Sequence, residues 1–274
     1  MEMKEFIHKK PYLIAGPCSA ESENQLLTIA KAIEGTADVF RAGVWKPRTK
    51  PNSFEGIGKE ALTWLKTVQQ ETGMKVFTEV ATAKHVELCL ESGVDMLWIG
   101  ARTTVNPFYV QEIAEALKGV DIPVFVKNPI HPELGLWLGA FERLNKVGIK
   151  QLAAIHRGFY SYEKSVFRND PKWELPIKLR KEIRGLPIIC DPSHIAGKAT
   201  LIEDIAQTAM DINLDGLMIE THNNPAVALS DAEQQVKPEK LKNITPSPSE
   251  GELDPHDAFR EIHVIHNSTF FKCF

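Results

Sequence analysis

Short apolar runs alternate with longer amphipathic segments along most of the chain. Each apolar run has the length and the Val, Ile and Leu content of a buried β-strand. Eight such runs occur, and each ends close to a polar or reactive residue. They span residues 12–19, 39–45, 75–80, 96–102, 123–129, 151–158, 187–194 and 216–222.

A segment with helical periodicity follows each of these runs. In the second of them, residues 57–71, apolar residues repeat at the spacing of one helix face. Asn106 before Pro107 predicts an N-cap followed by proline at the first helical position. The other predicted helices span residues 23–35, 82–92, 134–148, 176–184, 198–212 and 238–243.

Strands that alternate with helices imply parallel pairing through right-handed crossovers. Eight such units in roughly 235 residues match the size of a closed (β/α)₈ barrel, the TIM barrel. An open, doubly wound α/β sheet is the alternative. The chain has no GxGxxG after its first predicted strand and no GxxxxGK[ST], so the usual nucleotide-binding signatures are missing from the sequence. We predict a catalytic (β/α)₈ barrel over residues 1–244.

The last part of the chain breaks this pattern. Residues 245–274 begin rich in proline and serine and then show no sustained helix or strand period. We interpret them as a linker followed by a C-terminal appendage.

Composition excludes several classes of protein. The chain has 274 residues, 43% of them hydrophobic and 25% charged, as is usual for a globular protein. No apolar run approaches the ~20 residues of a membrane span, and the N-terminus has no apolar signal core, so we expect a cytoplasmic location and no membrane partner. The net charge of −4 gives no footprint for nucleic acid. The four cysteines are widely spaced, which favours thiols or ligands over disulfides.

Cationic residues lie where the predicted strands stop, and a barrel gathers these ends on one face. So many positive groups in one cavity would repel each other without bound anions. Arginine binds phosphate or carboxylate through two hydrogen bonds, and lysine acts as a point charge. The cavity therefore suits small, multiply anionic substrates, and ion pairing with nearby acids is the alternative. The cationic set is Arg41, Lys46, Arg48, Arg102, Lys127 and Arg157.

A second set combines a thiol, an imidazole and two carboxylates: Cys18, His194, Glu220 and Asp231. Such a mixture of S, N and O donors suits a divalent transition metal such as Mn, Fe, Co or Zn. The residues are distant in sequence, but the first, seventh and eighth strands become neighbours when the barrel closes. Cys18 alone leaves two other interpretations open, an inert buried thiol and a nucleophile activated by His194.

Six motifs resemble those of 3-deoxy-D-arabino-heptulosonate 7-phosphate (DAHP) synthase, most closely its type Iβ branch, over about residues 8–243. The resemblance implies a (β/α)₈ barrel that condenses phosphoenolpyruvate (PEP) with erythrose 4-phosphate and releases phosphate. This reaction is the first step of the shikimate pathway, which leads to the aromatic amino acids. The motifs are AGPCS at 15–19, RAGVWKPRT at 41–49, GAR at 100–102, HRG at 156–158, DPSH at 191–194 and IETHNNPAVALSD at 219–231.

The same resemblance implies a role for each matching residue. It makes Cys18, His194, Glu220 and Asp231 the metal ligands. It makes Lys46, Glu79 and His194 catalytic, with Lys46 between the two substrates as a proton donor and Glu79 near the water that attacks PEP. Pro47, Arg48 and Thr49 correspond to the erythrose 4-phosphate site. The residues implied for PEP are Arg41, Arg102, Lys127 and Arg157, and Ala101 is implied as a further substrate-binding residue.

Two alternatives to this function are considered. The nearest is 3-deoxy-D-manno-octulosonate 8-phosphate synthase, which uses arabinose 5-phosphate and typically carries KANRSS and DATH where this chain has KPRT and DPSH. These differences favour the four-carbon sugar. The other is a sugar-phosphate sensor that keeps the barrel without catalysis, against which the complete ligand and cation sets argue.

The ends of the chain bear on regulation. About ten residues precede the first predicted strand, too few for the regulatory domain that some relatives carry there. Residues 245–274 are too short for the chorismate mutase domain of other relatives. We expect a homo-oligomer, as is usual in the family, and we interpret the tail as an interaction element that recruits a separate chorismate mutase.

Overall fold

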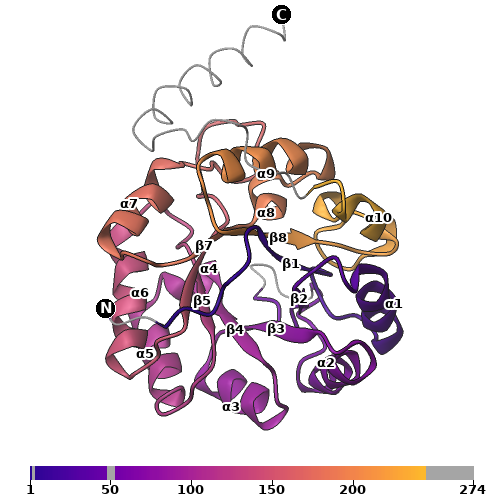
Figure 1. The fold of residues 1–274 in the computed structure, drawn as a ribbon, viewed down its shortest axis with the longest axis horizontal. Helices are drawn as coiled ribbons and strands as arrows, with labels where there is room; N and C mark the ends of the chain where they lie inside the picture. Colours follow the sequence, from indigo (N-terminus) through magenta and orange to yellow (C-terminus); the bar gives the residue numbers. More distant parts are fainter. Residues whose placement is uncertain (2–3, 48–52, 245–274) are drawn as a thin grey trace, which may run out of the picture.

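The computed structural model describes residues 1, 4–47 and 53–244. Eight parallel strands form a closed barrel in which neighbours follow the sequence order and β8 pairs with β1 (Figure 1). This closure confirms the predicted (β/α)₈ barrel and excludes an open sheet. The strands are β1 Tyr12–Gly16, β2 Val39–Arg41, β3 Lys75–Val80, β4 Met96–Ile99, β5 Val124–Lys127, β6 Leu152–His156, β7 Ile188–Cys190 and β8 Gly216–Glu220.

Helices surround the barrel on its outer face (Figure 1). The side chains of Ser22, Thr82 and Asn106 each accept a backbone N–H in the first turn of a helix, and thereby satisfy a group that the helix leaves free. The α-helices are α1 Glu23–Ile33, α2 Lys59–Thr72, α3 Ala83–Glu91, α4 Ala101–Thr104, α5 Pro107–Ala116, α6 Leu134–Lys146, α7 Glu174–Glu182, α8 Pro192–Ala196, α9 Ile202–Asp211 and α10 Pro238–Leu241. Three 3₁₀ turns are η1 Ala199–Leu201, η2 Pro225–Val227 and η3 Ala232–Gln234.

Seven of the eight predicted strands are shorter in the structure than the sequence pattern indicated, and in two of them a short helix takes the place of the last predicted strand residues. β4 ends at Ile99 and β7 at Cys190, and the short helices α4 and α8 begin within two residues of these ends. At α8 the Asp191 side chain accepts the N–H of His194, and proline occupies the first helical position. Arg102 and His194 therefore project from helical turns and not from extended strands.

The hydrophobic core has two layers. The larger layer lies between the strands and the outer helices. The smaller fills the barrel itself, and includes Phe77, Trp98 and Phe125. The segment before β1 crosses the barrel (Figure 1) and adds Ile7 to this inner layer, while Phe6 packs edge-on against Phe125 at 5.6 Å. This segment closes the amino-terminal end of the barrel, so the loops at the carboxyl ends of the strands are left to form a site.

Two sequence predictions concern parts of the chain beyond the barrel. The interpretation of residues 245–274 as linker and appendage lies outside the described residues. Across the described ranges, no helix is both long enough and apolar enough to cross a membrane.

Candidate active site

A cavity of about 360 Å³ opens at the carboxyl ends of the strands. It gathers nine of the residues that the sequence predicted for the site. Arg48 and Thr49, also predicted, lie outside the described residues. A larger cavity of about 640 Å³ lies at the opposite end, but barrel enzymes build their active sites at the carboxyl ends. The smaller cavity is lined by Lys46, Pro47, Glu79, Ala101, Arg102, Lys127, Ile130, Arg157, Tyr160, Arg168, Asn169, His194 and Asp231.

One wall of this cavity is strongly cationic. The Lys127 ammonium pairs with Asp191 at 3.0 Å, and the Arg157 guanidinium donates to Asn169 Oδ1 at 2.8 Å. The pKa of Arg157 is lowered to about 10, mainly by burial, with Arg168 and Arg102 adding to the effect and Asp191 opposing it. Arg157 is therefore charged at neutral pH, and the wall can bind an anion.

Arg41 lies beneath the cavity and not in its lining. Its side chain is only 1% exposed. The guanidinium donates to Glu220 Oε1 at 2.8 Å and to the Pro17 carbonyl at 3.1 Å, and it stacks over the Trp98 ring at 4.9 Å. Among the residues predicted for PEP, Arg41 is thus the one that the structure places against a carboxylate of the predicted metal group.

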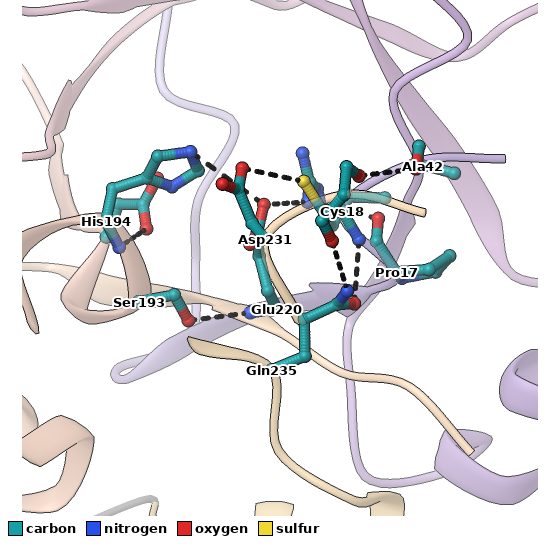
Figure 2. A network of polar contacts seen from close by, with 12 residues as sticks. Pro17, Cys18, Ala42, Ser193, His194, Glu220, Asp231 and Gln235 are labelled. Carbon is teal, nitrogen blue, oxygen red and sulfur yellow. Dashed lines mark hydrogen bonds and ion pairs between the residues drawn. The ribbon is translucent and has the colours of Figure 1, made fainter. Parts of the chain in front are cut away.

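The predicted metal ligands converge at the seam where the barrel closes. One ligand atom each from Cys18, Glu220 and Asp231 lie within 4.8 Å of one another. His194 borders this group, with Nε2 3.9 Å from Glu220 Oε1. Figure 2 shows the four side chains pointing toward one another. A sulfur, an imidazole nitrogen and carboxylate oxygens at this spacing fit a divalent transition metal.

Cys18 is fully buried and is held by several hydrogen bonds. The Lys46 ammonium donates to Cys18 Sγ at 2.9 Å, and the thiol lies 3.2 Å from Asp231 Oδ2. Burial raises the pKa of Cys18 to about 12, with Glu220 adding to the effect and Lys46 opposing it. A nucleophilic cysteine needs a lowered pKa or an adjacent base, so the raised pKa disfavours a nucleophile. The neighbouring donor atoms of Glu220 and Asp231 support the ligand interpretation instead.

The sequence analysis did not assign a role to Asp191, which links the two parts of the site. Its buried carboxylate accepts from Lys127 and lies 2.8 Å from His194 Nδ1. Burial alone would raise the pKa of Asp191, but His194 and Lys127 outweigh it and hold that pKa well below the ordinary value. Its position in the DPSH motif is the sequence signal that could have identified Asp191 as a site residue.

Arg168 and Asn169 were also missed. Arg168 donates to Asp231 Oδ1 at 2.9 Å and to Gln234 Oε1 at 2.6 Å. Asn169 donates to the His194 carbonyl at 2.6 Å. Both belong to the long loop between β6 and α7, which has no periodicity that could have placed them near the cavity.

Glu79 is fixed in the cavity wall by two neighbours. Its Oε2 accepts the Trp98 indole N–H at 2.8 Å. A Cβ atom added at Gly100 would lie 2.3 Å from Glu79 Oε1. The glycine of the GAR motif therefore leaves the space that this carboxylate occupies.

A (β/α)₈ barrel with a cationic cavity beside a thiol–carboxylate donor group defines a barrel enzyme that acts on small anionic substrates. The particular family follows from comparison with known proteins. The model of the DAHP synthetase I family matches residues 7–251, and the chain belongs to this family. The family predicted from the sequence motifs is thus confirmed.

Individual relatives agree with this assignment. Phospho-2-dehydro-3-deoxyheptonate aldolase of Thermotoga maritima is 31% identical over 85% of this chain and 67% of its own length. The crystal structure of phospho-2-dehydro-3-deoxyheptonate aldolase (DAHP synthase) from the same organism matches with a TM-score of 0.77 and 26% identity, over 93% of this chain and 70% of that chain. A 2-dehydro-3-deoxyphosphooctonate aldolase of Campylobacter jejuni is 28% identical, over 86% of this chain and 95% of its own length.

Proposed function

We propose that the protein condenses PEP with erythrose 4-phosphate to give DAHP and phosphate. The observation that carries this proposal is the position of Lys46. Its side chain lines the cationic cavity and its ammonium contacts Cys18 of the thiol–carboxylate group. One lysine thus lies between a site for anions and a site for a metal, as a condensation of two phosphorylated substrates requires.

We propose that a divalent metal ion, Mn, Fe, Co or Zn, is held by Cys18, His194, Glu220 and Asp231. The donor chemistry and the 4.8 Å grouping of three of these residues support it. When bound, such an ion polarises a carbonyl oxygen as a Lewis acid.

The cationic wall would bind and orient PEP. Lys127, Arg102 and Arg157 can neutralise its phosphate and carboxylate, and Arg41 acts from beneath through Glu220. Pro47 lines the part of the cavity where we expect the aldehyde substrate. Together with Arg48 and Thr49, it forms the motif that we assign to erythrose 4-phosphate. Two anions held side by side in one cavity react as if in a single molecule.

Lys46 is suited to supply a proton. Burial alone would lower the pKa of Lys46, but Cys18 and Glu220 outweigh it and raise that pKa. The ammonium can therefore donate to the aldehyde oxygen as C3 of PEP bonds to the aldehyde carbon. Water then adds to C2 and passes its proton to Glu79, and the resulting hemiketal loses phosphate.

The test is PEP consumption and phosphate release with erythrose 4-phosphate or arabinose 5-phosphate, before and after chelation. We expect turnover with the four-carbon sugar, loss of activity when metal is removed, and recovery when it is returned. A preference for arabinose 5-phosphate would support the octulosonate alternative. Full activity after verified metal removal would contradict the metal, and binding of both sugar phosphates without turnover would indicate a sensor.

Replacing the sulfur ligand gives a prediction for the metal group. Cys18→Ser should weaken metal binding and activity together, because the hydroxyl is a poorer ligand than a thiolate for these ions. Metal affinity is measured by competition with a chromophoric chelator. Cys89→Ser is the control. Cys89 lies on the buried face of α3, and this variant should keep the wild-type metal affinity. Full metal-dependent activity of Cys18→Ser would show that the sulfur is not an essential ligand.

We further propose that the protein forms a homo-oligomer and that residues 245–274 recruit a separate chorismate mutase. A chain ending at Ile244 tests the second part. Loss of mutase binding, or a changed oligomeric state, with the barrel's activity retained would support it. Unchanged activity, oligomeric state and partner binding would contradict it.

A further inference from the structure

Trp45 and His85 form a stacked aromatic pair beside the cavity. Their ring centroids are 3.9 Å apart and the rings are within 4° of parallel. Trp45 follows β2, and His85 lies in the first turn of α3. The pair thus joins two consecutive loops at the carboxyl end of the barrel, one of which carries Lys46 and Pro47.

Trp45 lies at the neck of the loop that follows β2. Two backbone hydrogen bonds close this neck, from Lys46 N–H to the Glu55 carbonyl and from Gly58 N–H to the Val44 carbonyl, each at 2.8 Å. The returning chain passes close to Trp45. Gly56 has φ +92°, and a Cβ atom there would lie 2.3 Å from the Val44 oxygen and 3.0 Å from Trp45 Cα. The tryptophan is therefore fixed where the outgoing and returning chains meet.

His85 provides a fixed surface for the indole ring. Its backbone N–H donates to the Thr82 hydroxyl at 3.2 Å, and its Nδ1 accepts the N–H of Ala81 at 3.3 Å. Ala81 directly follows β3, so the imidazole is tied to the end of a barrel strand. Stacking on this ring connects the neck of the loop after β2 to the end of strand β3.

The Trp45–His85 stack lines a second cavity. Lys46 lines the same cavity, so the stack can affect the position of Lys46. That cavity, of about 300 Å³, is lined by Trp45, Lys46, Pro47, Glu55, Glu79, Ala81 and His85. It shares Lys46, Pro47 and Glu79 with the substrate cavity. Without the stacked rings, the Lys46–Pro47 segment would have room to shift away from Cys18, which the ammonium now contacts at 2.9 Å.

We propose that Trp45 and His85 are positioning residues, which hold the Lys46–Pro47 segment against the substrate cavity so that the aldehyde substrate binds in register with Lys46. This inference rests on the proposed function for the identity of that substrate. The pair touches neither the cationic wall nor the donor group, so its effect should fall on one substrate and spare the other.

Steady-state kinetics of four variants test this proposal. Trp45→Ala and His85→Ala should each raise KM for erythrose 4-phosphate by roughly three- to tenfold, the range that an aromatic pair contributes, with KM for PEP changed less than about twofold. Trp45→Phe keeps a ring stacked on the anchored imidazole and should remain near wild type. His85→Phe keeps a ring but loses the Nδ1 acceptor for the Ala81 N–H, so its KM for erythrose 4-phosphate should lie between wild type and His85→Ala. The double alanine variant should be no worse than either single variant, because both remove the same contact.

A second readout does not depend on the substrate. Hydrogen–deuterium exchange of the peptides containing Lys46 and Gly58 should be faster in both alanine variants and near wild type in Trp45→Phe. Phe108→Ala, at an exposed position of α5, is the control and should change neither readout.

The possible outcomes separate the two proposals. No wild-type turnover with erythrose 4-phosphate would contradict the proposed function, while faster exchange at the neck would still support the positioning role. Alanine variants that lower only the melting temperature, or that raise both KM values equally without faster exchange at the neck, would overturn the positioning role.

Discussion

At the scale of single residues, the site depends on buried charges that neutralise one another. Asp191 lies between Lys127 and His194, and Glu220 between Arg41 and the other donors of the predicted metal group. Each carboxylate is almost fully buried. A buried charge is tolerated only while its partner remains, so these acids keep their neighbours charged and in place.

Asp191→Asn should remove the buried negative charge that lies between Lys127 and His194. The change leaves the Lys127 ammonium buried without its counter-charge, which costs about 3–5 kcal/mol of unfolding free energy. Because His194 also loses its partner, kcat/KM should fall by about two orders of magnitude. Denaturant unfolding and steady-state kinetics measure the two effects. Glu87→Gln, which breaks the exposed pair with Lys84, should change neither, and a wild-type kcat/KM in Asp191→Asn would contradict the role given to Asp191.

His156 gives a pH prediction for stability. It is fully buried among Trp137, Phe159 and Trp173, and burial lowers its pKa to about 3. The unfolded chain takes up a proton below pH ~6.5 and the folded chain does not until about pH 3, so stability falls as the pH falls through this window. The contribution is about 1.4 kcal/mol per pH unit.

Urea unfolding between pH 4 and 8 measures this slope. His156→Gln should flatten it below pH ~6.5 whatever its stability at neutral pH, because the group that titrates is gone. His8→Gln, at an exposed position, should leave the slope unchanged. An equal slope in wild type and His156→Gln would show that His156 is protonated in the folded state.

Nine of the residues predicted from the sequence line the cavity, but the contacts between the predicted residues could not be read from the sequence. Cys18 and Lys46 belong to different motifs, and nothing in either motif indicates the 2.9 Å contact between them. The family resemblance implied that Arg41 binds PEP, yet its guanidinium pairs with Glu220. Such choices depend on side-chain directions in three dimensions, which a pattern of residue types along the chain does not contain.

At the scale of elements, short segments after the strands place the functional groups. The alternation of strands and helices was readable because periodicity extends over many residues. The helices α4 and α8 have four and five residues, too few to establish a period, so the sequence pattern assigned their first residues to strands. These turns carry Arg102 and His194 into the cavity.

Another such segment is η3, between β8 and α10. It follows Asp231, whose backbone is left-handed with φ 49°, an unfavourable conformation that its surroundings must maintain. Gln234 accepts from Arg168 at 2.6 Å and donates to Glu220 Oε2 at 2.6 Å. Gln234 therefore contacts the Glu220 carboxylate directly and the Asp231 carboxylate through Arg168.

Gln234→Ala should weaken metal binding by about 10- to 100-fold, the effect of losing a group that orients metal ligands. Competition with a chromophoric chelator measures the affinity without reference to activity. Gln111→Ala, on the surface of α5, is the control and should bind metal as wild type does. Unchanged affinity in Gln234→Ala would show that Arg168 and Glu220 hold their positions without it.

At the scale of the whole molecule, the two ends of the barrel have different tasks. The amino-terminal end is closed by the segment containing Phe6 and Ile7, which packs on the inner core. The carboxyl end carries the cavity and the donor group. Stability and catalysis should therefore be separable by substitutions at opposite ends.

Ile7→Ala tests this separation. The loss of a nearly buried isoleucine side chain should lower the free energy of unfolding by about 2–4 kcal/mol, while kcat and both KM values stay within about twofold of wild type. Thermal or urea unfolding and steady-state kinetics are the measurements. Phe108→Ala, which truncates an exposed side chain at the other end, should leave stability nearly unchanged. A large change of KM in Ile7→Ala would show that the two ends are coupled.

The pairing of β8 with β1 also has a consequence for synthesis of the protein. Cys18 leaves the ribosome before its partner Asp231, which follows 213 residues later. A nascent or prematurely ended chain therefore carries the thiol without the carboxylates that complete the donor group. The complete set of donors exists only after translation has passed the eighth strand, so loading of the proposed metal would be a late event, coupled to completion of the barrel.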